Sequence, residues 1–137
     1  MARFKTLNSE EIAQTLQNGR LYRSRSFLVF FAPIREVSDN NEILIDENLS
    51  LGKIAFIAPK KIGNAVLRNR CKRVLRAGFL NILDSEDIRD IYDKNNIILM
   101  SNMKTYRSTS IDVSDELISA FNKYADYKLG RVNARKC

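Results

Sequence analysis

Seven of the 17 residues from Lys60 to Arg76 are lysine or arginine, and none is acidic. Ammonium and guanidinium groups at this density bind phosphate, and a guanidinium also stacks on a nucleic-acid base. The whole chain has 23 basic and 16 acidic residues, so the residues outside this segment carry 16 of each and no net charge. Charge concentrated in one short segment favours a polyanion on one surface, and nucleic acid is the first candidate.

The spacing within this segment predicts a helix that holds the bases outward. At about 100° per residue the apolar side chains fall on one side, as in a helix packed on a core. This stripe contains Leu67, Cys71, Val74, Leu75, Gly78 and Ile82. Arg68, Lys72 and Arg76 form a row beside it, and Asn69, Arg70 and Arg73 fill the far side. Gly63 and Asn64 are turn and N-cap residue types, so free N–H groups that favour phosphate are expected next to Lys60 and Lys61.

A solvated helix face is the alternative interpretation of such a charge run. The bases from residue 68 to residue 76 repel one another, and no acid stands three or four residues away within the segment to relieve them. This repulsion indicates an external anion.

The composition argues against a catalytic site in the protein. The chain has no histidine, so a nuclease with a His base or a His-rich metal site is excluded. The carboxylates between Asp84 and Asp93 are able in principle to hold Mg²⁺, but such clusters more often serve solubility. We therefore predict a binding protein with no catalytic residue and no metal site.

The segment KKIGNAVLRNRCKRVLR, centred on Arg68-Asn69-Arg70, resembles the signature of the bacterial ribonuclease P protein subunit. The resemblance implies an accessory subunit that binds the catalytic RNA and the 5′ leader of precursor tRNA and assists endonucleolytic removal of the leader. It implies catalysis in the RNA subunit, Mg²⁺ held mainly by RNA, and a protein that is inactive alone. The alternative function is a ribosomal or other RNA-binding module without a processing role.

The resemblance also implies which residues bind which RNA. The catalytic RNA is expected to contact Lys60, Lys61, Asn64, Arg68, Asn69, Arg70, Lys72, Arg73 and Arg76. The leader is expected in a cleft between helices and the sheet, near Ile12, Leu16, Leu28 and Phe30. Phe30 is equally well interpreted as a stacking platform for an unpaired base or as a core residue.

The remaining elements follow from caps and periodicity. A first helix begins after Asn8 and ends near Asn18, with Ile12, Ala13 and Leu16 on its buried face. Strands are predicted over Phe27–Pro33, Gly52–Ala58 and Asn96–Ser101, and a last helix runs from after Asp112 to about Leu129. Residues 20–26 contain three arginines and are either a solvated loop or an RNA contact. Residues 84–93 are expected to add a helical turn or two.

These elements predict one α+β domain over residues 1–137, a mixed sheet with three helices. An acidic loop is expected over about residues 36–50 and a basic tail over about residues 131–137. The resemblance adds a left-handed strand–helix–strand crossover, against the usual right-handed rule.

The chain is expected to be cytoplasmic and without membrane contact. Its longest apolar runs are too short to cross a bilayer, and its first residues lack a signal-peptide core. Cys71 and Cys137 are far apart in sequence, so neither a structural disulfide nor a disulfide-linked partner is expected.

Overall fold

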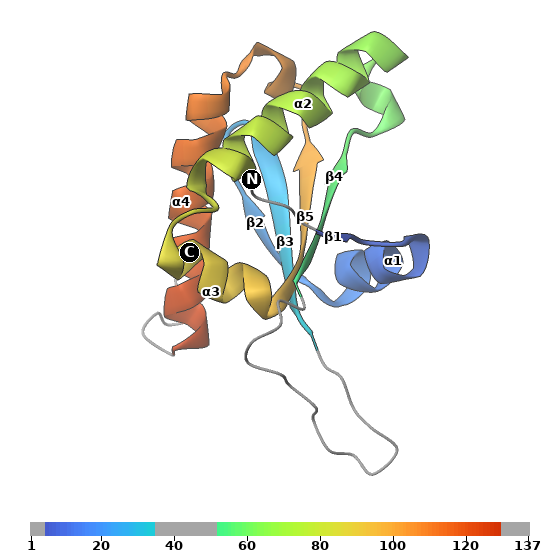
Figure 1. The fold of residues 1–137 in the computed structure, drawn as a ribbon. Helices are drawn as coiled ribbons and strands as arrows, with labels where there is room; N and C mark the ends of the chain where they lie inside the picture. The colour runs from blue at the N-terminus through green and yellow to red at the C-terminus, as the bar shows by residue number, and fades with distance from the viewer. Residues whose placement is uncertain (1–4, 35–51, 130–137) are drawn as a thin grey trace.

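The computed structural model describes residues 5–34 and 52–129, in which four α-helices surround a five-stranded sheet (Figure 1). In chain order the elements are β1 Lys5–Thr6, α1 Ser9–Asn18, β2 Arg20–Arg23, β3 Phe27–Pro33, β4 Lys53–Ile57, the 3₁₀-helix η1 Lys60–Ile62, α2 Ala65–Ile82, α3 Glu86–Asp93, β5 Asn95–Ser101, the 3₁₀-helix η2 Thr105–Arg107, and α4 Ser110–Lys128. The α+β class is confirmed. The count of three helices is wrong, because residues 86–93 form a regular helix behind a serine cap position and two acidic first-turn residues.

The sheet is mixed, as predicted, and its order is β1-β4-β5-β3-β2. Strand β5 lies in its centre, parallel to β4 and antiparallel to β3. In Figure 1 the arrows of β4 and β5 both point upward, α2 crosses in front of the sheet, and β5 lies to the left of β4. This connection is left-handed, opposite to the hand that most such crossovers adopt.

Local capping explains where the helices begin. Asn8 and Glu11 form a reciprocal capping box at the start of α1. The Asn64 side chain accepts a hydrogen bond of 3.0 Å from the Leu67 N–H and caps α2, as predicted. Thr109 forms a second capping box with Asp112, so α4 begins at Ser110, slightly before the predicted start. These side chains satisfy backbone N–H groups that the first helical turn leaves without partners.

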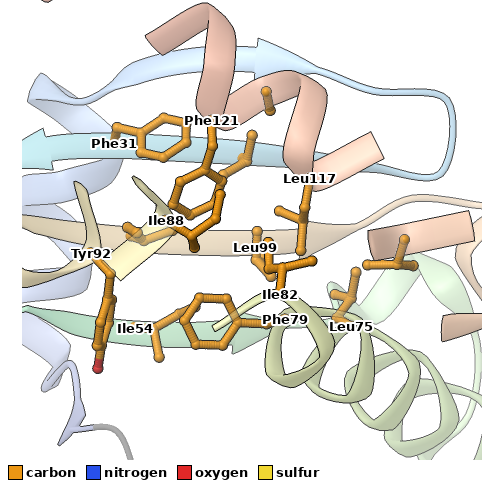
Figure 2. Close-up of a cluster of buried hydrophobic side chains, with 14 of the residues drawn as sticks. Phe31, Ile54, Leu75, Phe79, Ile82, Ile88, Tyr92, Leu99, Leu117 and Phe121 are labelled. Atoms are coloured by element: carbon orange, nitrogen blue, oxygen red, sulfur yellow. The ribbon is translucent and has the colours of Figure 1, made fainter. Parts of the chain in front are cut away.

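The main core lies between the sheet and helices α2, α3 and α4 (Figure 2). Strand β3 alternates, with Phe27, Val29 and Phe31 fully buried on this side and its intervening residues on the other. The Phe31 ring stacks on Tyr124 of α4 with centroids 4.3 Å apart, and it meets the edge of Phe121 at 5.1 Å. Offset and edge-to-face aromatic pairs of this kind add to the free energy of burial.

A buried hydrogen bond fixes α4 to the start of β5. The Tyr124 hydroxyl donates to the Asn95 Oδ1 at 2.7 Å, and the Asn95 side-chain nitrogen donates to the Ile91 carbonyl at 2.7 Å. Burial of the Tyr124 hydroxyl, which disfavours the phenolate, raises its pKa to about 12. Helices α3 and α4 are therefore joined to the sheet through one asparagine.

Gly78 permits the close approach of α2 and α4. A Cβ at this position would lie 2.4 Å from the Val113 Cγ1 and 3.2 Å from the Ser110 carbonyl oxygen. The Ser114 hydroxyl also donates to the Gly78 carbonyl at 2.9 Å across this contact. The prediction that Gly78 belongs to the buried stripe of this helix is confirmed.

Two local predictions differ from the structure. The one buried residue of α1 is Thr15, and Ala13 and Leu16 are exposed, because α1 meets the sheet with a more polar side than its apolar residues suggested. Residues 20–23 form β2 against β3, so the loop prediction there is wrong.

The predicted acidic loop of residues 36–50 and the basic tail of residues 131–137 lie outside the described residues. Within the described residues, no helix combines the length and apolar character needed to cross a membrane.

Candidate nucleic-acid interface

The basic residues of α2 point in three different directions. Asn69, Lys72, Arg73 and Arg76 line a groove of about 470 Å³ between α2 and strand β4. Arg70 lies on the other side of α2, where its Nε donates to the Tyr106 carbonyl of η2 at 3.0 Å. Arg68 is half-buried, and its Nε is enclosed without a hydrogen-bond partner among the described residues. Lys72, Arg73 and Arg76 are therefore the exposed bases of α2 that lie together, along one groove.

The buried stripe of α2 explains this arrangement. Cys71, Leu75 and Gly78 are buried as predicted, and Phe79 joins them with a fully buried ring, while Leu67 is only partly buried. Desolvation raises the pKa of the Cys71 thiol. Because the stripe faces the core, the side chains on the opposite arc of the helix face solvent. Lys60 and Lys61 are also exposed, in η1 just before the α2 cap.

The floor of the groove is apolar and comes from α1 and β4. Ile12, Ala55 and Ile57 line it, together with Thr6, Ile54 and Phe56. Thr6 ends the short strand β1, which pairs only with Lys53 and Ile54 of β4. The β4 residues carry no sequence signal of a binding site, although the alternation of Lys53–Ile57 indicates a strand with two different faces.

The structure does not bring the four predicted leader-binding residues together at this floor. Sheet register places Ala55, Ile98 and Phe30 side by side in one row, and Ile57, Met100 and Leu28 in the next. Phe30 and Ile12 are partly buried against a small cluster of Leu7, Ala55 and Ile98. Leu28 is partly buried, and Leu16 is 36% exposed on α1. Ile12 is the one of the four that lines the groove itself.

An ion pair holds α1 against β4 beside the groove. The Lys53 Nζ lies 2.7 Å from the Glu11 Oε2, and the Lys53 and Glu11 side chains remain 33% and 24% exposed. The hydrogen bonds that Glu11 accepts, first from the Asn8 backbone and then from Lys53, lower its pKa. Glu11 therefore stays ionised at neutral pH and both caps α1 and ties it to the sheet.

The groove offers binding groups but no catalytic ones. Its lining combines cations and an amide from α2 with apolar side chains and one threonine, and contains no carboxylate. In residues 5–34 and 52–129, no three His, Cys, Asp or Glu side chains are grouped so that they could share a metal ion. This finding covers the carboxylates of residues 84–93. The groove suits a single-stranded nucleic acid whose phosphates lie along α2 and whose bases lie over the apolar floor.

Comparisons with known proteins show which family the chain resembles. A family model described as Ribonuclease P matches residues 1–125. The ribonuclease P protein component of Oceanobacillus iheyensis is 34% identical over 90 residues, which cover 66% of this chain and 63% of that protein. The Listeria innocua protein of the same name is 26% identical over 134 residues, covering 98% of this chain and 93% of that one. The chain thus spans less than two thirds of the first relative and nearly all of the second.

A solved structure shows the same fold. The RNase P protein of Staphylococcus aureus superposes with a TM-score of 0.60, covering 90% of this chain and 96% of that one. The two sequences are 19% identical, so this likeness supports the architecture alone.

Proposed function

Because the chain belongs to the ribonuclease P protein family, we propose that it is the protein subunit of the tRNA-processing enzyme ribonuclease P. In this role it binds the catalytic RNA and the 5′ leader of precursor tRNA, and it assists the cleavage that produces the mature 5′ end. The observation that supports this most directly is the groove in which Lys72, Arg73 and Arg76 stand over an apolar floor. A cytoplasmic location is part of the proposal.

The leader would lie in the groove. Three cations that line one groove bind phosphates without reading base identity, and Ile12, Ala55 and Ile57 offer an apolar surface to the bases. A leader has no fixed sequence, and a site of this composition suits such a strand. Lys60, Lys61 and Asn64 at the α2 end, with Arg68 and Arg70, remain proposed contacts of the catalytic RNA.

The protein would assist hydrolysis without performing it. The chain has no histidine, and the groove has no carboxylate that could act as a general base. Hydrolysis is therefore assigned to the RNA subunit, with Mg²⁺ held mainly by RNA. The cations of the protein would offset phosphate repulsion, so that fewer free Mg²⁺ ions are needed for the same assembly.

A cleavage assay tests this division of labour. Precursor tRNA is incubated with the protein, with a bacterial ribonuclease P RNA, and with both, over a range of Mg²⁺ concentrations. We expect no cleavage by the protein alone and a lower Mg²⁺ requirement for the RNA when the protein is present. RNA-free turnover by pure protein would refute the accessory role. An RNA-binding module without a processing role would leave the Mg²⁺ requirement unchanged.

Phe30 provides a separate test of leader binding. A base stacked on an aromatic ring contributes about 1–3 kcal/mol, so Phe30→Leu is expected to weaken holoenzyme binding of precursor tRNA while leaving mature tRNA binding nearly unchanged. Phe31→Leu is the matched control, because it makes the same change on the opposite, fully buried side of β3. Both variants are compared by thermal unfolding. Equal losses for precursor and mature tRNA, with a lowered melting temperature, would make Phe30 a packing residue.

A further inference from the structure

A second group of cations lies on the side of α2 opposite the groove. Arg25 follows β2, and Lys104 and Arg107 belong to the connection between β5 and α4. These three exposed side chains, here called the η2 patch, surround a hollow of about 340 Å³. Lys104 and Arg107 do not stand out in the sequence, because the acidic residues of Ile111–Glu116 follow closely and balance their charge.

The backbone that carries the η2 patch is held by polar side chains. The Ser26 N–H and hydroxyl each donate to one oxygen of the Glu116 carboxylate at 2.8 Å. The Asn102 side-chain amide donates to the Arg25 carbonyl at 3.1 Å, and its oxygen accepts from the Lys104 N–H at 2.8 Å. The Ser108 hydroxyl donates to the Lys104 carbonyl at 3.0 Å. Arg25 and Lys104 are thus fixed at their main chains, which lowers the entropy lost on binding.

Two carboxylates, Glu116 and Asp112, also line the hollow, and hydrogen bonds to neutral groups hold them in place, so the three cations exceed them by one charge. Both oxygens of Glu116 accept from Ser26, and Asp112 closes the capping box with Thr109. The hydrogen bonds from Thr109 lower the pKa of Asp112, with a smaller contribution from Arg25. Among the described residues, none of the three cations of the patch forms an ion pair within 4.0 Å. The patch therefore has positive groups available to an external anion.

Arg70 connects the η2 patch to α2. Its Nε donates to the Tyr106 carbonyl at 3.0 Å, and the Arg107 Nε donates to the Tyr106 hydroxyl at 2.9 Å. The Arg107 guanidinium carbon lies 5.2 Å from the centre of the Tyr106 ring. Figure 1 shows the connection between β5 and α4 beside the N-terminal half of α2. One continuous basic surface thus runs from α2 across η2.

We propose that the η2 patch binds the phosphate backbone of the catalytic RNA, and that α2 is held by RNA on both of its exposed sides. The proposal rests on the proposed function. The composition of the hollow distinguishes it from the groove, because serine, lysine, arginine and carboxylate side chains line it and no apolar side chain does. Such a surface suits phosphates, whereas stacking of unpaired bases needs an apolar or aromatic floor of the kind that the groove supplies.

Binding measurements at several salt concentrations test the proposal. The variant carries Arg25→Ala, Lys104→Ala and Arg107→Ala, and binding to ribonuclease P RNA is measured without tRNA. Each phosphate contact contributes about 0.7–0.9 to the slope of log affinity against log salt, so we expect the slope to decrease by about 1–2. The affinity is expected to fall roughly 10- to 100-fold near 0.1 M salt.

The matched control removes the same charge elsewhere, through Arg89→Ala, Lys94→Ala and Lys123→Ala on or beside α3 and α4. Both variants are expected to keep the thermal stability of the parent, because all six side chains are exposed.

If the patch variant binds like the parent while substitutions in α2 still weaken binding, the proposal for the η2 patch is wrong and the proposed function stands. Insensitivity of RNA binding to both α2 and the patch would instead refute the proposed function. A loss seen only with precursor tRNA would assign the patch to the leader and overturn its assignment to the catalytic RNA.

Discussion

Replacing Lys72, Arg73 and Arg76 together by alanine is expected to lower affinity for ribonuclease P RNA bound to precursor tRNA by roughly 100- to 1000-fold near 0.1 M salt. These three exposed side chains of α2 line the groove, and their removal takes away up to three phosphate contacts. The slope of log affinity against log salt is expected to decrease by about 2–3, since each contact releases counterions. The deficit should therefore shrink as salt rises.

The same control as for the η2 patch separates local contacts from net charge. Arg89, Lys94 and Lys123 replaced by alanine give a protein of identical formal charge, so long-range attraction to RNA falls equally in both. An equal loss of slope in the control would show that net charge, and not the groove, determines binding. Unfolding curves of all three proteins confirm that the comparison is made between folded chains.

Phe31→Ala is expected to lower the free energy of unfolding by about 3–5 kcal/mol, which is a large share of the stability of a typical small domain. The ring is fully buried and contacts Tyr22, Phe121 and Tyr124. Figure 2 shows Phe31 and Phe121 together within the cluster. Its removal leaves a cavity between β3 and α4 and breaks the stacked pair, so loss of transfer free energy and loss of packing add together.

Phe30→Ala is the matched control for this change, because Phe30 is the neighbouring residue of the same type on the other side of the sheet. Phe30 is only partly buried against the small cluster near α1, so its removal is expected to cost clearly less. Chemical denaturation measures both free energies. Equal costs for the two variants would contradict a main core confined to the α2, α3 and α4 side of the sheet.

The sequence predicted best those features that depend on near neighbours along the chain. The Asn64 cap, the stripe through Cys71, Leu75 and Gly78, and the limits of β3 all follow from spacing and residue type, and the structure confirms them. Strand β2 escaped prediction because its sequence is arginine-rich, and because its Tyr22 packs against Phe31 of β3 and against Tyr124 of α4, which is far away in sequence.

The sequence predicted which residues of the candidate site are charged, but not which residues lie together in it. Periodicity placed Lys72, Arg73 and Arg76 outside the core, but their pairing with Ile12 and Ile57 depends on α1 and β4 meeting α2 in space. The same limit explains Arg70, whose bond to the Tyr106 carbonyl joins segments 36 residues apart. The hand of the crossover came from family resemblance, because periodicity carries no information about handedness.

The central position of β5 has a consequence for how the protein is made. Strand β5 is the last of the described strands along the chain, yet it joins β4 to β3, so each of these two strands lacks its partner on one edge until about residue 101 has left the ribosome. The residues of helix α2 are synthesised before β5, but a helix of this length gains most of its stability from packing, and its bases repel one another. During translation the nascent chain therefore presents this cationic segment while β3 and β4 each still expose one unpaired edge. The segment is accessible to polyanions before the sheet that later orients it is complete.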